Sequence, residues 1–382
     1  MKILHVSPSY YPATYWGGPI FSVNALNIAL AKFEEIEITV LTTDSAGPSV
    51  SERLPLESSY SINDNIKIIY SRRIWGASTS LDLLMSLPSL IKTSDIVHLT
   101  GTYSFPTLPT LFICRLFRKP IVWSPRGAML DSDIWSGSKK IFLKKIWNKF
   151  CYHLVGKKLV IHTTSKAEYH SAKKNFPDTN ICIIPNSVNA PSVQKYFNKI
   201  SLDSILNIMY IGRLSEKKGI ERLIESIKLF QTKNVHLNIY GNGDLEYKNR
   251  LKGLVKNYEL ECSITFHGQV DGEAKENAFL NNDICVAPSY TENFCMSIAE
   301  ALSYGLPVIA SKGTPWELVK VFNCGMWVDN DPKTLYNSIR LLSSLNLSIM
   351  GNNGRKWIES DFSDQKIAHK MIESYSFLLQ KK

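Results

Sequence analysis

The 382-residue chain has no long hydrophobic run, and this limits the functions open to it. No stretch reaches the roughly 18 consecutive apolar residues of a membrane-spanning helix. The apolar part of its opening, MKILHVSPSYYP, is too short for the core of a signal peptide. We therefore do not expect a secreted or integral membrane protein, and we predict a cytoplasmic one.

Cysteine is also scarce, and its placement excludes two further classes. The 7 cysteines are scattered, lie mostly inside apolar runs and show none of the paired spacings of zinc sites. They are Cys114, Cys151, Cys182, Cys262, Cys285, Cys295 and Cys324. We expect buried, reduced thiols, as in cytosolic proteins, and neither a disulfide framework nor a zinc site.

Acidic residues are outnumbered, with 34 Asp and Glu against 44 Lys and Arg, for a net charge of +10. This excess favours an anionic partner such as a nucleoside diphosphate, a phosphorylated lipid or an anionic membrane surface. No nucleic-acid-binding module is recognisable, so we expect no nucleic-acid partner. The length and the 44% hydrophobic content suit two domains of about 180 residues, each with its own core.

Short buried-strand patterns alternate with helical stretches, as in a parallel sheet with helices on both faces. In the first half we expect strands at 3–6, 37–41, 66–70, 95–99, 121–123 and 159–162. In the second half we expect them at 206–211, 237–244, 264–270, 284–287, 307–310 and 325–328. The polar, patternless stretch after Val188 is typical of a linker. We predict an α/β domain over 1–190 and a second over 191–363.

The stretch 283–316 is the centre of the predicted site. It follows a strand, loop, helix, strand pattern, and doubly wound sheets bind ligands at the carboxyl ends of their strands. Glu292 lies in the loop and Glu300 about two helical turns further on, so the pair can address opposite ends of one elongated ligand. Two glutamates at this spacing also occur on solvated helix starts, so the pair alone does not define a site.

A second charged segment, GRLSEKKG, follows the strand at 206–211. Gly212 permits a sharp turn, and Arg213 and Lys218 flank the start of an amphipathic helix. Two cations beside a helix N-terminus suit a diphosphate, because the helix dipole also favours negative charge there. We expect the adjacent Lys217 to be solvated.

Three further features of the first half lie at strand ends. Gly17 and Gly18 form a turn between the first strand and a helix, which suits an anion but is also common for steric reasons. His98 fits either a hydrogen-bonded core histidine or a substrate contact. Arg126 is interpreted as a partner for a phosphate or an acceptor anion, because a guanidinium stays charged near neutral pH.

These motifs together resemble the retaining glycosyltransferases of the GT-B fold, in particular family 4 (glycosyl transferases group 1). Glu292 and Glu300 match its signature of two glutamates separated by seven residues, and GRLSEKKG matches its G-R-L-x-x-x-K-G diphosphate clamp. The resemblance implies two Rossmann-like domains facing across a cleft that holds the active site. It also implies that a terminal helix, residues 364–382, crosses back to the first domain.

The implied activity is transfer of a sugar from a nucleotide-sugar donor, with retention of configuration and without a metal or other cofactor. The implied acceptor is a glycan or a polyprenyl-phosphate-linked glycan, in cell-surface polysaccharide synthesis. Arg213 and Lys218 would neutralise the departing diphosphate, and Glu292 would orient the sugar. Substrate-binding positions would be Gly17, Gly18, His98, Arg126, Gly241, Gln269, Val270, Asn293, Phe294, Cys295 and Glu300.

Within that set, Glu300 would hold the ribose, and Gln269 with Val270 would meet the base. Two positions depart from the family pattern. Cys295 stands where the family usually has glycine, so contacts to backbone N–H groups there are in question. Arg126 stands where many members have a histidine near the acceptor.

Three alternative interpretations remain open from the sequence. Asp131 and Asp133 form an Asp-x-Asp pair, the metal-binding signature of the other large glycosyltransferase fold, GT-A. A sugar-nucleotide epimerase can share the GT-B fold and bind the same donor without an acceptor. A non-catalytic nucleotide-sugar binding protein would keep the clamp, although the presence of both glutamates disfavours it.

Residues 139–158 form a lysine-rich helical segment with two interpretations. An apolar stripe runs along one face, and lysines lie on or beside the other with no acid among them; the stripe comprises Phe142, Leu143, Ile146, Trp147, Phe150 and Leu154. The stripe could pack on the sheet of the first domain. Alternatively, the lysines could hold the protein at an anionic membrane on its cytosolic face, where a lipid-phosphate acceptor would be found.

Overall fold

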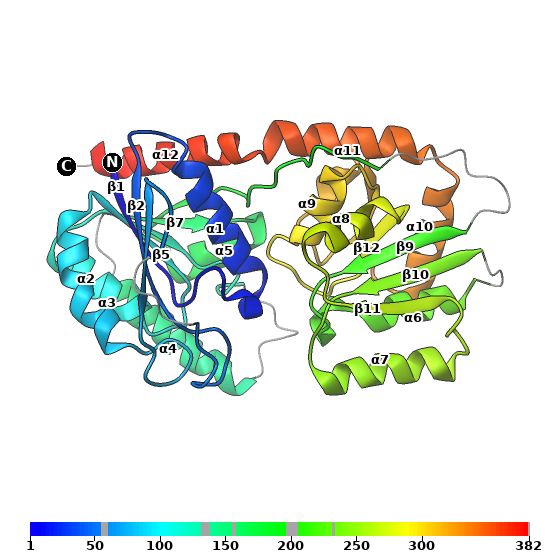
Figure 1. Ribbon diagram of the computed structural model, residues 1–382, viewed down its shortest axis with the longest axis horizontal. Helices are drawn as coiled ribbons and strands as arrows, with labels where there is room; N and C mark the ends of the chain where they lie inside the picture. Colours follow the sequence, from blue (N-terminus) through cyan, green and yellow to red (C-terminus); the bar gives the residue numbers. More distant parts are fainter. Residues whose placement is uncertain (55–59, 131–137, 155–157, 196–204, 231–233, 381–382) are drawn as a thin grey trace. The chain divides into compact units, whose positions relative to one another are not determined.

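The computed structural model describes residues 1–54, 60–130, 138–154, 158–195, 205–230 and 234–380 (Figure 1). The chain divides into two compact units. Unit 1 comprises Met1–Ser187 and Asp364–Lys382, and unit 2 comprises Val188–Ser363. Each unit is built on one sheet with helices on both faces, so the predicted doubly wound α/β architecture is confirmed.

The strands of unit 1 are mostly those that the sequence predicts. They are β1 (Lys2–Val6), β2 (Glu37–Thr43), β3 (Tyr60–Asn63), β4 (Ile66–Ser71), β5 (Ile96–Thr100), β6 (Ile121–Ser124), β7 (Leu159–Thr163) and β8 (Asn180–Ile183). Their order in the sheet is β3-β4-β2-β1-β5-β6-β7-β8. All neighbours pair in parallel except β3, which forms an antiparallel hairpin with β4 and which the sequence pattern did not reveal.

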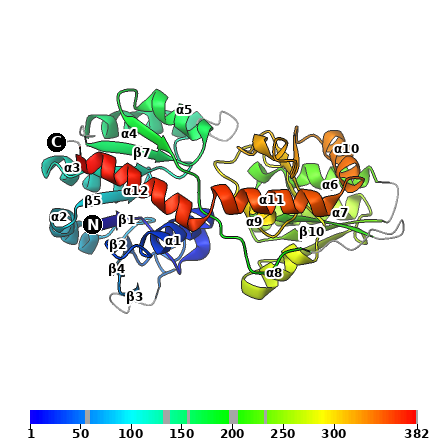
Figure 2. The same ribbon diagram turned by 90° about the horizontal axis from the view of Figure 1, so that it is seen from above.

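Two layers of helices cover the sheet of unit 1 (Figures 1 and 2). The helices are α1 (Gly18–Leu30), α2 (Leu81–Thr93), α3 (Thr107–Leu116), α4 (Ser138–Leu154), α5 (Lys166–Asn175) and α12 (Asp364–Gln380). On one face, α1 and α12 contribute Leu26 and Met371 to a core with Val40 and Val122. On the other face, α2 to α5 pack against strand residues such as Trp123.

Unit 2 repeats the design with six strands and its own helices. Its strands are β9 (Leu206–Ile211), β10 (Val235–Tyr240), β11 (Ile264–Gly268), β12 (Ile284–Ala287), β13 (Val308–Ser311) and β14 (Gly325–Val328). Its helices are α6 (Ile220–Lys228), α7 (Leu245–Asn257), α8 (Gly272–Leu280), α9 (Met296–Ser303), α10 (Pro332–Ser343) and α11 (Leu347–Asp361). Among the residues described in both units, no helix is long and apolar enough to cross a bilayer.

The strand order of unit 2, β11-β10-β9-β12-β13-β14, fixes where a ligand can bind. The chain winds outward from β9 through β10 and β11, then returns to the other side of β9 and winds outward again from β12. The connections that leave β9 and β12 therefore run in opposite directions. The place between the carboxyl ends of these two strands is the switch point of the sheet, and ligands of such sheets bind there. The segments at that point are 212–219 and 288–295.

Most of the cysteines are buried thiols, as the sequence predicts, but Cys262 is not. Five of them are buried, Cys182 is partly buried and Cys262 is exposed, and all seven are free thiols. Burial raises the pKa of Cys114 and of Cys151 to about 12, so these thiols stay protonated at neutral pH.

Candidate active site

A largely buried ion pair joins the two loops at the switch point of unit 2. The Nζ atom of Lys218, at the end of the loop after β9, contacts Oε1 of Glu292, in the loop after β12. Ser289 Oγ donates a second hydrogen bond to the same carboxylate oxygen at 2.9 Å. Both predicted catalytic side chains are little exposed, at 17% for Lys218 and 10% for Glu292. The structure thus brings together two motifs that lie far apart in the sequence.

Two glycines make this close approach possible. Gly219 has a φ of 63°, and a Cβ atom on it would lie 2.4 Å from the carbonyl oxygen of Pro288. Gly313 lies in the loop after β13, and a Cβ on it would lie 2.3 Å from the carbonyl oxygen of Tyr290, so a larger residue there would displace the loop after β12. A larger residue at Gly219 would push the loops after β9 and β12 apart. A backbone hydrogen bond from Tyr290 to the carbonyl of Lys217, 2.9 Å long, holds them together.

The charges of the pair stabilise each other. Burial alone would lower the pKa of Lys218, but the neighbouring carboxylate of Glu292 outweighs it and the pKa is raised. Burial would likewise raise the pKa of Glu292, but Lys218 and the hydrogen bond from Ser289 hold it below its ordinary value. Both groups therefore remain ionised at neutral pH.

Arg213 and Lys217 lie in the same loop as Lys218, and both side chains are exposed. The Tyr210 hydroxyl donates a 3.0 Å hydrogen bond to the carbonyl of Arg213, which fixes the backbone where the loop begins. Lost hydration and the adjacent Lys218 lower the pKa of Lys217. Three cations in one short loop thus lie immediately before α6, whose N-terminus also favours negative charge.

The residues after Glu292 divide between surface and core. Asn293 is half-buried. Phe294 packs in the core of unit 2 against Trp316 and Phe362, with ring centroids 5.3 and 6.0 Å apart. Its side chain is therefore part of the core, and only its backbone could contact a ligand.

Cys295 adopts a backbone conformation that normally belongs to glycine. Its φ of 66° and ψ of 75° are left-handed, and it is the residue before the first turn of α9. The glycine-type conformation is kept although the side chain is larger, at a cost of about 1 to 2 kcal/mol. The side chain is buried, and burial raises the pKa of the thiol to about 12. Cys295 is thus a neutral core residue whose backbone begins the helix.

Glu300, on α9, forms an ion pair with a different lysine. Lys275 Nζ on α8 lies 2.7 Å from Glu300 Oε1, and the side chains are 34% and 25% exposed. This pair is more open to solvent than the pair of Lys218 and Glu292. A ligand hydroxyl group can therefore reach Glu300 by displacing an accessible lysine.

Gly241, Gln269 and Val270 follow the neighbouring strands β10 and β11. A Cβ on Gly241 would lie 1.9 Å from the carbonyl oxygen of Gly212, so glycine is required where the loops after β9 and β10 touch. Gln269 is exposed, and Val270 is partly buried against the core of unit 2. All three lie at the carboxyl ends of their strands, as the ion pair does, on the side of β9 away from β12.

In unit 1, the glycine turn has the expected open geometry. Gly17 has a φ of 69° and precedes α1, which begins at Gly18. A Cβ on either residue would meet nothing within 4 Å. The turn therefore leaves room for a ligand beside the N-terminus of α1.

His98, in contrast, is a core residue. Its side chain is fully buried, and both ring nitrogens are hydrogen-bonded, to Tyr375 and to Ser124, at 2.6 Å each. Burial lowers its pKa well below the ordinary value, so the ring is neutral. Of the two sequence interpretations, the structure supports the core histidine, because this side chain has no surface that a substrate could contact.

Arg126 combines a left-handed backbone with an incompletely paired guanidinium. Its φ is 55°, and Nη1 donates a 2.6 Å hydrogen bond to Asn186. Nε and Nη2 are buried and have no hydrogen-bond partner among the described residues. Burial lowers the pKa of Arg126 to about 10, with Glu168 opposing the shift, so the group stays charged at neutral pH. Two unused donors on a buried cation are a place for an anion.

No group of three His, Cys, Asp or Glu residues that could hold a metal ion is found in the part of the chain that the structure describes. Asp131 and Asp133, the alternative metal pair, lie outside that part.

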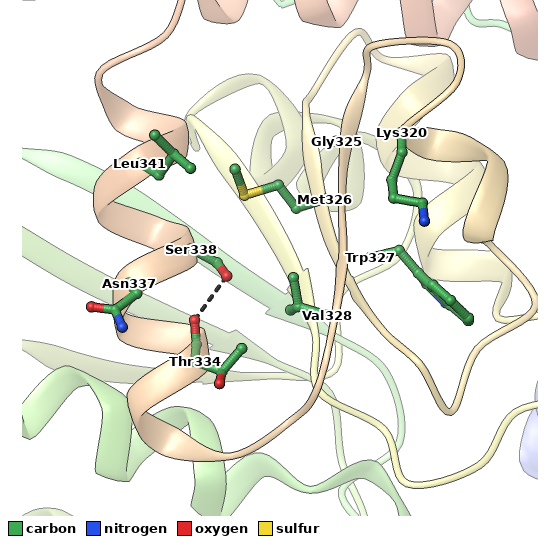
Figure 3. A pocket seen from close by; sticks show the side chains of 9 residues that line it. All are labelled: Lys320, Gly325, Met326, Trp327, Val328, Thr334, Asn337, Ser338 and Leu341. Atoms are coloured by element: carbon green, nitrogen blue, oxygen red, sulfur yellow. Dashed lines mark hydrogen bonds between the residues drawn. The ribbon is translucent and has the colours of Figure 1, made fainter.

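A hollow of about 440 Å³ lies elsewhere in unit 2, between the edge strand β14 and α10 (Figure 3). It is lined by Lys320, Gly325, Met326, Trp327, Val328, Thr334, Asn337, Ser338 and Leu341. No residue of the predicted site contributes to it. The carboxylates identified above therefore belong to a different place on the unit.

Two supporting residues could not be identified from the sequence. Ser289 is buried and donates to Glu292, but the glutamate signature in the same loop did not mark this serine. Lys275 lies inside a helix whose sequence, GEAKENAFL, marks none of its charges as special. Only the packing of α8 beside α9 identifies Lys275 as the partner of Glu300.

The second unit of the chain matches a family model. Residues 194–357 match the model described as Glycosyl transferases group 1. An uncharacterized glycosyltransferase of Methanocaldococcus jannaschii is 27% identical over 221 residues, which are 54% of this chain and 56% of that protein. A putative colanic acid biosynthesis glycosyltransferase, WcaL of Escherichia coli, is 28% identical over 42% of this chain and 43% of its own length. The chain thus spans about half the length of these relatives.

Solved structures match over the whole chain. Sucrose-phosphate synthase from Thermosynechococcus elongatus has a TM-score of 0.75 at 20% identity, covering 100% of both chains. HepE from Anabaena in complex with UDP-glucose has a TM-score of 0.73 at 16% identity, covering 99% of this chain and 100% of that one. At these identities the likeness shows the fold alone, which is GT-B.

Proposed function

Because residues 194–357 match the glycosyl transferases group 1 family model, we propose that the protein transfers a sugar from a nucleoside-diphosphate sugar to an acceptor. The observation that carries the proposal is the pair of Lys218 and Glu292, which joins the loops after β9 and β12 at the switch point. A UDP-sugar donor has support from HepE, whose structure contains UDP-glucose.

The diphosphate of the donor would bind beside the N-terminus of α6. Lys218 already has a raised pKa and a carboxylate partner, so its charge is held in place before the ligand arrives. Arg213, exposed in the same loop, would supply the second cation. Neutralising the oxygen that becomes negative as the sugar leaves is the largest contribution that the protein can make to this reaction.

In the proposed reaction the bond between the anomeric carbon and the diphosphate oxygen breaks, and the bond to the acceptor hydroxyl oxygen forms on the same face. The acceptor proton passes to the departing diphosphate oxygen, so configuration is retained and no protein base is needed. Glu292 would orient the sugar through hydroxyl groups and stabilise positive charge at the anomeric carbon. This use of carboxylates differs from that of a two-carboxylate glycosidase.

Glu300 would hold the ribose of the donor. Its carboxylate is bound by Lys275, which is about one third exposed and able to move away. A ribose offers two hydroxyl donors, and each would form a charge-assisted hydrogen bond with Glu300. Gly241, Gln269 and Val270 lie at the same sheet edge and would complete the nucleotide site.

The acceptor is proposed to be a glycan, free or linked to a polyprenyl phosphate, in cell-surface polysaccharide synthesis. Arg126, with its two unused buried donors, would bind a phosphate or another anion on the acceptor. The names of relatives such as WcaL support the polysaccharide setting. The inner face of the cytoplasmic membrane is the location that a lipid-linked acceptor requires.

A thermal-shift series tests the donor site. A panel of nucleoside diphosphates and their sugars is added to the wild-type protein, because a ligand at 100 times its dissociation constant stabilises by about 2.7 kcal/mol. The expected result is a shift with one nucleotide class that is reduced in Glu300→Gln and unchanged in Lys252→Met, a control on the exposed face of α7. Absence of a shift with every member of the panel would contradict the proposal.

A transfer assay then separates the transferase from its alternatives. The shifted donor is incubated with and without acceptor glycans, and NMR of the product reports the anomeric configuration. Product should form only with an acceptor, with the donor's configuration, and in the presence of EDTA. An epimer formed from the donor alone, or activity lost to EDTA and restored by manganese, would replace this mechanism with one of the alternatives.

A further inference from the structure

Helices α3 and α4 are neighbours in unit 1 (Figure 1), and both carry exposed apolar side chains. On α4 the exposed fractions are 68% for Phe142, 65% for Leu143, 50% for Ile146 and 53% for Phe150. On the adjacent α3 they are 55% for Phe112 and 64% for Leu116. We call these six residues the α3–α4 apolar face. Soluble proteins rarely expose contiguous apolar side chains, and such a surface indicates a site of interaction with a partner or a membrane.

The opposite face of α4 makes the contacts with the rest of unit 1. Trp147 Nε1 donates to the carbonyl of Thr102 at 3.0 Å, and Asn148 donates to Asn175 at 3.1 Å. Cys151 is fully buried between them and the core. The interpretation that the apolar stripe of this segment packs on the sheet is therefore wrong for its most apolar members, which point outward.

Positive charge surrounds this apolar face. Lys145 and Lys149 are exposed on α4, one turn apart and beside the stripe. Arg115 and Arg118 are exposed at the end of α3, and Arg115 binds the carbonyl of His153, which ties that end to α4. No Asp or Glu occurs in Ser138–Leu154. The combination of aromatic and aliphatic side chains with cations alone is typical of a helix that lies in a membrane interface.

We propose that the α3–α4 apolar face inserts into the headgroup region of an anionic phospholipid bilayer. The lysines and arginines attract the lipid phosphates, and the exposed rings and aliphatic chains leave water by entering the acyl boundary. A second copy of the chain is a poorer occupant, because a symmetric contact would bring two sets of cations together. The inference is independent of sugar transfer, since it concerns a surface on which no proposed site residue lies.

The experiment is co-sedimentation of the full chain with vesicles of phosphatidylcholine alone or with about one third phosphatidylglycerol. Two double variants divide the surface: Lys145→Glu with Lys149→Glu, and Phe142→Ser with Phe150→Ser. Their matched controls lie on unit 2. Lys252→Glu with Lys256→Glu reverses two exposed lysines of α7, and Leu341→Ser with Ile349→Ser removes two apolar residues that are 53% and 55% exposed.

The wild-type protein should bind the anionic vesicles, and binding should weaken as salt rises. The lysine variant should bind at least about 30-fold more weakly, because each lysine near the surface contributes about 1 kcal/mol and each new glutamate is repelled by the anionic lipid. The phenylalanine variant should lose at least about 10-fold at every salt concentration, while both controls bind normally. Urea unfolding and a second pair, Leu143→Ser with Ile146→Ser, separate lost binding from lost folding.

Three results would overturn the proposal. They are equal binding to neutral and anionic vesicles, undiminished binding of the phenylalanine variant, and a wild-type dimer that the phenylalanine variant converts to a monomer. The last would assign the surface to a second copy of the chain.

Discussion

The two units share a winding order but use the end of their sheets differently. In unit 2, charged side chains lie in the loops after β9, β12 and β10, and two lysine–glutamate pairs are partly accessible. In unit 1, the buried histidines His5, His98 and His162 lie inside β1, β5 and β7, within two residues of the carboxyl ends of these strands. The shared topology therefore places polar groups near the carboxyl ends of the strands in both units. Whether these groups can contact a ligand depends on how deeply they are buried.

The polar groups of unit 1 form a hydrogen-bond chain that satisfies itself. Since the Ile184 carbonyl can only accept, His162 Nε2 donates to it, and His162 Nδ1 accepts from Ser124. Ser124 then accepts from His98 Nε2, and His98 Nδ1 accepts from the Tyr375 hydroxyl. Every member is neutral and fully paired. This series of hydrogen bonds links β5, β6, β7 and α12. None of its members has a donor or acceptor left to bind a substrate.

The largest expected effect concerns the paired lysine of unit 2. Lys218→Met should lower turnover by about 10²-fold or more, because a charge aimed at the leaving group is lost. It should also lower the free energy of unfolding by about 3 to 5 kcal/mol, since Glu292 is left buried without its partner. Steady-state kinetics and urea unfolding measure the two effects.

The exposed Arg213 provides the contrast within the same loop. Arg213→Met should lower turnover by a similar factor while leaving the unfolding free energy within about 0.5 kcal/mol of wild type. The double variant Lys218→Met with Glu292→Gln should recover stability without recovering activity. Wild-type turnover in both single variants would contradict the assignment of Arg213 and Lys218 to the diphosphate.

The second prediction is that the stability of unit 1 falls more than that of unit 2 when the pH is lowered. Burial lowers the pKa of His5 to about 4 and that of His162 to about 3, against 6.5 when unfolded. The folded state therefore binds fewer protons than the unfolded one below pH 6.5. Stability from each histidine is complete above pH 6.5 and is lost as the pH falls toward the folded values. Each should cost about 2 kcal/mol between pH 7 and pH 5.

Unit 2 should resist the same change. The pKa of Glu292 is held below 4.5, so the pair with Lys218 loses stability only at lower pH. Hydrogen exchange, corrected for its intrinsic pH dependence, should show the strands of unit 1 opening more at pH 5 and those of unit 2 little changed. His162→Gln should reduce the pH dependence of unit 1. Equal acid sensitivity of both units would contradict the neutral histidine chain.

The contrast between the units also shows where sequence reasoning succeeds. The apolar run Ile284–Ala287 is buried on both faces of a parallel sheet, and the middle of the mostly apolar Leu206–Ile211 is buried too, so the pattern predicted both strands with their observed bounds. The switch point follows from the order of such strands. The meeting of the loops that carry Lys218 and Glu292 was therefore predictable, and their direct ion pair adds detail to it.

Other features depend on packing that periodicity does not encode. The antiparallel strand Tyr60–Asn63 is short and polar, so no apolar run marked it. The stripe along α4 has a clear period, but a period does not say which side faces the sheet. His98 lies near the predicted carboxyl end of a buried strand, a position that suits either a site or a core, and only its burial and its two hydrogen bonds decide between them. In each case the missing information is the identity of the neighbour.

A smaller effect tests the more open pair of unit 2. Glu300→Gln should weaken nucleoside-diphosphate binding by about 10-fold, because charge-assisted bonds to the ribose become neutral ones. Lys275→Met should leave binding unchanged or tighten it a few-fold, since the ribose no longer competes with the lysine. Isothermal titration with the nucleotide found in the thermal-shift panel measures both. Weaker binding in Lys275→Met would make this lysine a ligand contact instead of a competitor.

The smallest expected effect is at Cys295, which stands where the family that unit 2 resembles usually has glycine. The residue keeps a left-handed φ of 66°, a conformation that strains every residue with a Cβ atom. Cys295→Ala removes the buried thiol but keeps the strain, whereas Cys295→Gly removes both. Glycine should therefore be more stable than alanine here by about 1 kcal/mol, the reverse of their usual order in helices. Urea unfolding of the two variants provides the measurement, and Ser303→Ala against Ser303→Gly within α9 is a matched control that should show the usual order. If alanine were the more stable at position 295 as well, the backbone there would not be left-handed, and the loop between Glu292 and α9 would have to present its N–H groups in another direction.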